Sequence, residues 1–169
     1  MTMKIKEIKS DQEMADSAAL LRESFFTIAK ELGFTEENYP TYPAFINSSK
    51  LKALQEKKNI KMFGLFVENF HVGFASVEKT EGLSEYQMHL LAILPEYRNK
   101  TYGTYLMNYV YEYVKREKGK KIKIEIIDDN ALLKDWLKEY GFVELEIKTS
   151  KHLPLKICFL EKEISFAPH

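Results

Sequence analysis

The residues best suited to chemistry lie in residues 90–104, which read Leu-Leu-Ala-Ile-Leu-Pro-Glu-Tyr-Arg-Asn-Lys-Thr-Tyr-Gly-Thr. The apolar run ends at Pro95, which has no amide proton for a strand ladder. A polar loop with one glycine, Gly103, then leads into a helix. The first turn of a helix carries backbone N–H groups without intrahelical partners, at the positive end of the helix dipole. With Arg98 and Lys100 beside it, this loop is predicted to bind a phosphate or a pyrophosphate.

A strand and a helix are expected to position this loop. Residues 90–94 form a continuous apolar run of the length typical of a strand that is buried on both faces. After the loop, apolar side chains recur at three- and four-residue spacing, which indicates one buried helix face; they are Leu106, Tyr109, Val110, Tyr113 and Val114. The sequence therefore predicts a central strand, an anion-binding loop and an amphipathic helix in succession.

The rest of the chain alternates strand and helix patterns. Ser10 and Glu13 have the spacing of a capping box at the start of the first helix, and Gly33 is expected to end it. Strands are expected at residues 3–8, 60–67, 71–77, 122–126, 142–148 and 155–162, and further helices at residues 47–58 and 130–140. This order predicts an α/β (α+β) fold with a single mixed β-sheet flanked by helices. The strands on either side of the central helix are expected to be parallel, because a helix connects them.

Composition restricts the class of protein. The chain has 169 residues, which is consistent with one domain over residues 1–169. Its 25 basic and 25 acidic side chains cancel, so no overall charge favours nucleic acid or an anionic membrane. The single cysteine, Cys158, has no partner for an internal disulfide, and the sequence suggests no metal site. Because there is no signal-peptide core and no apolar run of about 18 residues, we expect a soluble cytoplasmic protein.

Two motifs resemble one known family. Arg98-x-x-Thr101-x-Gly103-Thr104, after a Leu-Ala-Ile-Leu-Pro strand, is similar to the acyl-CoA-binding motif of the GNAT acetyltransferase superfamily, usually Arg/Gln-x-x-Gly-x-Gly/Ala. Thr101 replaces the first glycine of that motif. Residues 130–142 resemble the family segment Asn-x-x-Ala-x-x-x-Tyr-x-x-x-Gly-Phe. The resemblance covers residues 86–142 and implies the GNAT (acyl-CoA N-acyltransferase) fold, with acetyl-CoA as the acyl donor.

The resemblance also implies roles for particular residues. The backbone of the central strand would hold the pantetheine arm as an added strand would, and Asn130 would approach the same arm. The loop and the start of the helix would hold the pyrophosphate. The implied cofactor-binding residues are Leu91, Ala92, Ile93, Arg98, Asn99, Lys100, Thr101, Tyr102, Gly103, Thr104 and Asn130. Core packing is an equally good account of the side chains at 91–93, because side chains and backbone can serve different purposes.

The proton carriers are less clear from the sequence. The family's usual general acid is a tyrosine four residues before the Gly-Phe pair, and here that position is Leu137. Tyr140 lies near the same helix face but is expected to be a packing residue. The thiolate would then leave without a protein acid, or Tyr102 or Tyr105 would serve, or transferase activity has been lost.

His89 is the candidate general base. The family commonly has acidic residues in the central strand at positions that match Gln87 and His89, and a glutamine cannot act as a base. Histidine can, since its unperturbed pKa is about 6.5. The alternative for His89 is a hydrogen-bonded core residue, and Glu85 is the next candidate base.

Two functions remain open from the sequence. The first is an acetyl-CoA-dependent N-acetyltransferase that acts on a small amine or an exposed amino group in a ternary complex. The second is a CoA-binding regulatory or catalytically degenerate module, which Thr101 and Leu137 suggest. Residues 35–47, rich in aromatic side chains, would overlie the acceptor site in this family or would simply pack on the core. We expect no metal and no nucleic-acid or membrane partner, and a homodimer is left open.

Overall fold

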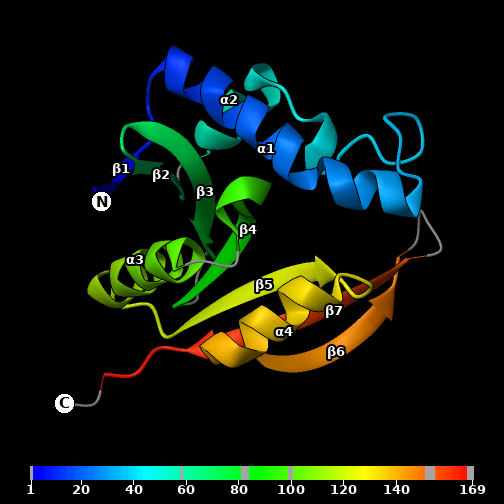
Figure 1. Ribbon diagram of the computed structural model, residues 1–169. Helices are drawn as coiled ribbons and strands as arrows, with labels where there is room; N and C mark the ends of the chain where they lie inside the picture. The colour runs from blue at the N-terminus through cyan, green and yellow to red at the C-terminus, as the bar shows by residue number, and fades with distance from the viewer. Residues whose placement is uncertain (1, 58, 81–83, 99–100, 151–154, 167–169) are drawn as a thin grey trace.

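One seven-stranded sheet organises the protein. The computed structural model describes residues 2–57, 59–80, 84–98, 101–150 and 155–166. The strands are β1 (Met3–Glu7), β2 (Ile60–Val67), β3 (Phe70–Lys79), β4 (Glu85–Ile93), β5 (Lys121–Ile127), β6 (Val143–Thr149) and β7 (Lys156–Glu163). The helices are α1 (Asp11–Leu32), α2 (Ser48–Gln55), α3 (Tyr102–Arg116) and α4 (Ala131–Tyr140). The strand order in the sheet is β1-β2-β3-β4-β5-β7-β6 (Figure 1).

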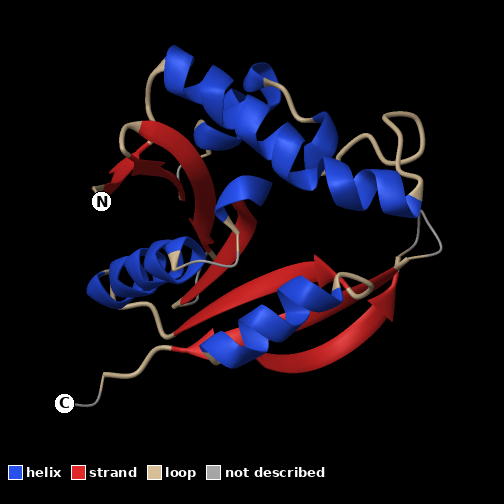
Figure 2. Cartoon of the chain, viewed as in Figure 1, coloured by secondary structure: helices blue, strands red, loops and turns tan. Residues whose placement is uncertain are grey.

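The sheet lies between two layers of helices (Figure 2). α1 and α2 cover one face of β2, β3 and β4, and their apolar side chains form one core cluster. α3 and α4 lie on the other face and form a second cluster with strands β2 to β5 and β7. No helix in the described part of the chain is both long enough and apolar enough to cross a bilayer.

β4 and β5 pair in parallel, as predicted for the two strands that the central helix connects. The other strand pairs are antiparallel. The β4–β5 pairing is short, because it runs only from Glu85 opposite Lys121 to Met88 opposite Ile124. β4 nevertheless remains paired with β3 as far as Ile93. The two parallel strands therefore diverge beyond Met88, and Figure 1 shows them separating.

A β-bulge in β4 marks the point of divergence. Val77 of β3 is opposite Met88, but Ser76 is opposite Leu90, so His89 is an extra residue on β4. The extra residue changes which side chains face each layer: Met88 packs with the α3 and α4 cluster, whereas Leu90 packs with the α1 and α2 cluster. The apolar run of the central strand thus contacts both helical layers.

Local sequence signals account for most helix ends. The capping box is confirmed: the Glu13 N–H donates to Ser10 Oγ (3.1 Å), and the Ser10 N–H donates to the Glu13 carboxylate (3.0 Å). Gly33 ends α1 in the left-handed conformation with φ 72°. The helix predicted at 47–58 is shorter than expected, since α2 ends at Gln55. The predicted order of helices and strands is otherwise confirmed.

Candidate active site

Two helices, α3 and α4, begin near the carboxyl ends of β4 and β5, where these strands diverge. Because the strands are parallel, their carboxyl ends point the same way, and α3 follows β4 while α4 follows β5. Beyond Met88, β3 is the strand neighbour of β4, and the edge of β4 that faces β5 is no longer paired with it. Ligand sites in open α/β sheets lie at this kind of position.

α3 begins at Tyr102, and its second residue, Gly103, lies close to α4. Thr101, at the N-cap, makes no side-chain capping hydrogen bond. A Cβ added at Gly103 would lie 3.3 Å from Trp136 Cζ2 of α4 and 3.9 Å from Ile93 Cγ1. Gly103 is not among the glycines with positive φ, so close approach, not backbone conformation, favours glycine here. Asn99 and Lys100 lie outside the described residues.

Arg98 makes two hydrogen bonds that the sequence did not predict. Its Nε donates a hydrogen bond to the Ile93 carbonyl oxygen (2.8 Å), and its Nη2 donates to the Ser24 carbonyl oxygen of α1 (2.7 Å). Burial lowers the pKa of the guanidinium, which nonetheless stays charged near neutral pH. The side chain therefore ties the loop to the end of β4 and to α1, and its expected contact with a pyrophosphate stays a prediction.

Asn130 caps α4 at the opposite side of the divergence. Its Oδ1 accepts a hydrogen bond from the Leu133 N–H (3.3 Å), which satisfies one of the first N–H groups of the helix. The sequence placed Asn130 at the cofactor arm, and the structure puts it at the same edge as the start of α3.

Leu137 faces the core of the protein. The side chain is fully buried in the α3 and α4 cluster. The neighbouring Trp136 is partly buried, and its ring stacks on that of Tyr140 with centroids 5.9 Å apart. The indole of Trp136, and not the side chain at 137, therefore lies beside Gly103. The sequence analysis did not assign Trp136 to the site, although it is the single tryptophan of the chain.

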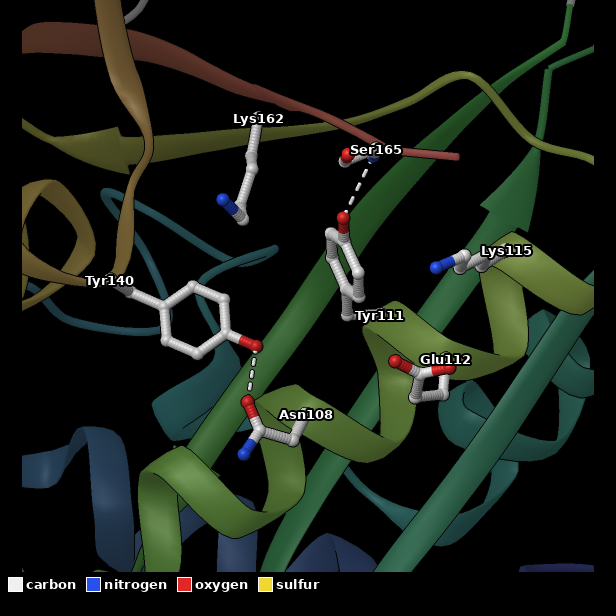
Figure 3. A pocket seen from close by; sticks show the side chains of 7 residues that line it. All are labelled: Asn108, Tyr111, Glu112, Lys115, Tyr140, Lys162 and Ser165. Atoms are coloured by element: carbon white, nitrogen blue, oxygen red, sulfur yellow. Dashed lines mark hydrogen bonds between the residues drawn. The ribbon is translucent and has the colours of Figure 1, made fainter. Parts of the chain in front are cut away.

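Tyr140 links α4 to α3 (Figure 3). Its hydroxyl donates to Asn108 Oδ1 (2.6 Å), and burial raises its pKa to about 12, so the phenol is protonated at neutral pH. A pocket of about 490 Å³ opens beside this bond, lined by Asn108, Tyr111, Glu112, Lys115, Tyr140, Lys162 and Ser165. Asn108 is five residues beyond Gly103 along α3, or roughly 7–8 Å. Tyr140 thus stabilises helix packing at a distance from the first turn of α3.

His89 is neither an apolar core residue nor unpaired. Its Nε2 lies 2.6 Å from Oε1 of Glu78 on β3, and its side chain is 39% exposed. The next candidate base, Glu85, forms an ion pair with Lys123 (3.0 Å). His71 is partly buried, stacks on Phe66 with ring centroids 4.6 Å apart, and has its pKa lowered by burial. Of the candidate bases, His89 lies directly at the divergence of β4 from β5.

Residues 35–47 pack as an ordered aromatic cluster. The Tyr42 ring is buried and meets Phe34 and Phe25 edge-on, with centroids 4.8 and 5.7 Å apart. The cluster extends to Ile127 at the end of β5. The segment therefore combines core packing with a position over the carboxyl end of β5.

Cys158 lies in a polar cluster beneath α4. One ligand atom each from Asp128, Glu144 and Cys158 lie within 4.8 Å of one another, the one such group in the described residues. The Lys134 ammonium bonds to Asp128 and lies 3.4 Å from Glu144, so a cation already neutralises these carboxylates. The Cys158 thiol donates to Glu144 (3.2 Å), and burial raises its pKa to about 11. This cluster is a structural ion pair.

Comparisons with known proteins agree with the architecture. The sequence model of the acetyltransferase (GNAT) family matches residues 20–150. A sequence search of curated proteins finds no significant match. The PaiA N-acetyltransferase of Thermoplasma acidophilum, solved with coenzyme A, superposes with a TM-score of 0.76 at 17% identity, over 96% of this chain and 99% of that one.

Two further solved structures show the same fold. The ribosomal-protein-S18-alanine N-acetyltransferase of Escherichia coli gives a TM-score of 0.75 at 16% identity, over 99% of this chain and 97% of that one. A putative streptothricin acetyltransferase of Bacillus anthracis, in complex with acetyl coenzyme A, gives 0.60 at 15% identity, over 65% of each chain. Because the family match spans most of the sequence and the fold agrees with it, this chain belongs to the acetyltransferase (GNAT) family.

Proposed function

We propose that residues 1–169 form a single acetyl-CoA-dependent N-acetyltransferase domain, which transfers an acetyl group to a primary amine of a small molecule or to an exposed amino group. The observation that carries this proposal is the divergence of β4 from β5 beside the N-terminus of α3, where Thr101 supplies no side-chain cap. The unpaired edge of β4 suits an extended amide chain, and the helix N-terminus suits a pyrophosphate.

The residues present fit coenzyme A. The backbone of Leu91, Ala92 and Ile93 would pair with the pantetheine arm, as a strand would. The N–H groups of Gly103 and Thr104 would face the pyrophosphate, with Arg98, Thr101 and Tyr102 close to it. Asn99 and Lys100, which the resemblance also implies, lie outside the described residues. Asn130 and Trp136 would border the arm from the side of α4. Glycine at 103 lets the Trp136 indole approach the first turn of α3 closely, so this ring would border a bound arm.

Bound acetyl-CoA supplies an activated thioester. The described residues offer what the transfer then needs: a β4 backbone N–H to polarise the carbonyl oxygen, and His89 to accept a proton from the attacking amine. The amine nitrogen forms the new bond to the acetyl carbon while the carbon–sulfur bond breaks. Leu137 has no proton to donate, so the departing sulfur takes its proton from water or another group.

The alternative is a CoA-binding regulatory or catalytically degenerate module. Its specific support is Leu137, which is fully buried at the position where the family usually has tyrosine. Binding of CoA is common to both functions, whereas release of free thiol in the presence of an amine is particular to the transferase.

The single tryptophan provides a direct binding assay. Titration with CoA and with acetyl-CoA is expected to change the Trp136 fluorescence, because the indole would border the pantetheine arm. Free thiol is then measured with acetyl-CoA and a panel of spermidine, tyramine and a lysine-containing peptide. Amine-dependent thiol release supports the transferase. A fluorescence change without thiol release favours the degenerate module, and no change in either contradicts both.

A further inference from the structure

We propose that Glu78 is a positioning residue, which holds His89 through Nε2 so that Nδ1 is left to accept the proton of the acceptor amine. This inference rests on the proposed transferase function and names a second residue of its proton-transfer site. Neither the sequence motifs nor the family match points to Glu78, which lies eleven residues before His89 on a different strand.

The first support is the place of His89 in the sheet. Met88 is the last residue of β4 that pairs with β5, so His89 is the first residue beyond the divergence. The backbone that would hold the pantetheine arm, from Leu91 to Ile93, begins two residues further along the strand. A base at this position lies where the strands begin to separate and where the reactive end of an inserted arm would stop.

The second support is the way in which the bulge is held. The Leu90 N–H donates to the buried hydroxyl of Ser76 (3.1 Å), so a side chain of β3 satisfies a backbone group of the bulged strand. Gln87 is opposite Glu78 and shares its face of the sheet. His89, two residues after Gln87, reaches back to Glu78 on that face. The bulge thus changes the face that Leu90 occupies, while His89 stays on the face that it shares with Gln87 and Glu78.

The third support is the contact itself. The His89 Nε2 and Glu78 Oε1 atoms are 2.6 Å apart, and both side chains are partly accessible, at 39% and 28%. A carboxylate can only accept a hydrogen bond, so the neutral His89 ring that bonds to ionised Glu78 has its proton on Nε2 and its lone pair on Nδ1. When the amine attacks, its proton passes to Nδ1, the carbon–sulfur bond breaks, and Glu78 stabilises the resulting imidazolium. The imidazolium later returns the proton to solvent.

Other charges on this face of the described sheet are largely paired with one another. Glu85 lies 3.0 Å from Lys123 and 4.0 Å from Lys121, and Lys121 lies 3.0 Å from Glu161. Glu125 follows Lys123 on the same side of β5 and is exposed. The carboxylate in contact with the His89 ring is that of Glu78.

The test combines tautomer and rate. Long-range ¹H–¹⁵N NMR of histidine-labelled protein is expected to show the Nε2–H tautomer for His89, whose signals are assigned by their loss in His89→Ala. In Glu78→Ala the His89 ring is expected to be a mixture of both tautomers. In the thiol-release assay, His89→Ala is expected to lower kcat ~10²–10⁴-fold, and Glu78→Gln about tenfold, because the imidazole remains. The KM for acetyl-CoA and the Trp136 fluorescence titration should not change, and Glu78→Asp should recover part of the rate.

The matched control is Glu7→Gln. Glu7 is a strand glutamate, 34% exposed, in an ion pair with Lys61 (3.7 Å) on β1 and β2, and its loss should leave kcat unchanged. An Nδ1–H tautomer in the wild type, or equal rates for Glu78→Gln and Glu7→Gln, would overturn the role of Glu78 while the transferase stands. Absence of thiol release from the wild type would instead overturn the proposed function, and the base with it.

Discussion

Substitutions at Gly103 should change the stability of the protein and its affinity for CoA to different extents, and the two effects can be measured separately. In Gly103→Ala the new methyl group meets Trp136 Cζ2 at 3.3 Å, a tight contact with a partly exposed ring that can shift by a few tenths of an ångström. Alanine also gains about 1 kcal/mol over glycine within a helix. The two effects nearly cancel, so the midpoint of thermal unfolding should change by no more than about 4 °C.

Gly103→Val is expected to behave differently. Its two further methyl groups approach both Trp136 and Ile93 Cγ1, which lies only 3.9 Å from the alanine methyl position. Overpacking of this kind costs about 1–3 kcal/mol, and valine is a poorer helix former than alanine. The midpoint should fall by roughly 2–12 °C, since about 1 kcal/mol shifts a chain of this size by ~2–4 °C.

Binding of CoA should fall in both variants. The added carbon atoms occupy the surface where the backbone would meet the pyrophosphate, so affinity should fall more in the valine variant than in the alanine variant. Differential scanning fluorimetry gives the stability, and calorimetric titration with CoA gives the affinity. Gly119→Ala controls for a crowded glycine elsewhere, because its Cβ would meet Val114 and Tyr86. A folded Gly103→Val protein with wild-type affinity for CoA would refute the assignment of this turn.

Four further predictions concern residues whose structural role is now defined. Arg98→Ala should lower the free energy of unfolding by about 3 kcal/mol, because two hydrogen bonds from a charged donor are lost. Urea unfolding in the absence of CoA measures this change, and a stability equal to that of the wild type would contradict the anchoring role. Leu137→Tyr should lower the free energy of unfolding by about 1–3 kcal/mol, because the larger side chain overpacks a fully buried position. It should not accelerate thiol release; acceleration would show that residue 137 can reach the thioester. Ser10→Ala should lower stability by about 1 kcal/mol at pH 7 through loss of the cap. The Ser10 and Lys9 N–H groups lower the pKa of Glu13 from near 4.5 to about 2, so its contribution is present above about pH 4.5 and is lost as the pH falls towards 2. The difference in unfolding free energy between wild type and Glu13→Gln should therefore shrink as the pH falls from about 4.5 to about 2. A constant difference would contradict the stabilising role of the ionised Glu13 carboxylate.

The role of Arg98 changes how its variants should be interpreted. The motif resemblance implied a phosphate ligand, but the guanidinium bonds to two backbone carbonyls from separate elements, β4 and α1. A loss of CoA affinity in Arg98→Ala would therefore report on the position of the loop as well as on charge. Arg98→Lys is a useful comparison, because lysine keeps the charge but lacks the planar fork that spans both carbonyls.

The amino-acid sequence by itself determined the succession of elements and most of their ends. Ser10 with Glu13, Gly33, and Asn130 act on neighbouring backbone groups, so their effect is visible in a few consecutive residues. The same holds for the passage from apolar strand through Pro95 into α3, and hence for the prediction of an anion site. The short spacing of these signals is the physical reason that they can be recognised without a structure.

Only the tertiary structure decided how the candidate site is built. The separation of β4 from β5 after Met88, the contact of His89 with Glu78, and the placement of Trp136 beside Gly103 all depend on contacts between distant segments. Strand register and helix packing arise from the combined burial of many side chains, and a shift of one residue reverses which face a strand side chain occupies. For this reason the sequence predicted His89 as a base but not its contact with Glu78. It also showed leucine at position 137 but not that the neighbouring Trp136 lies beside Gly103.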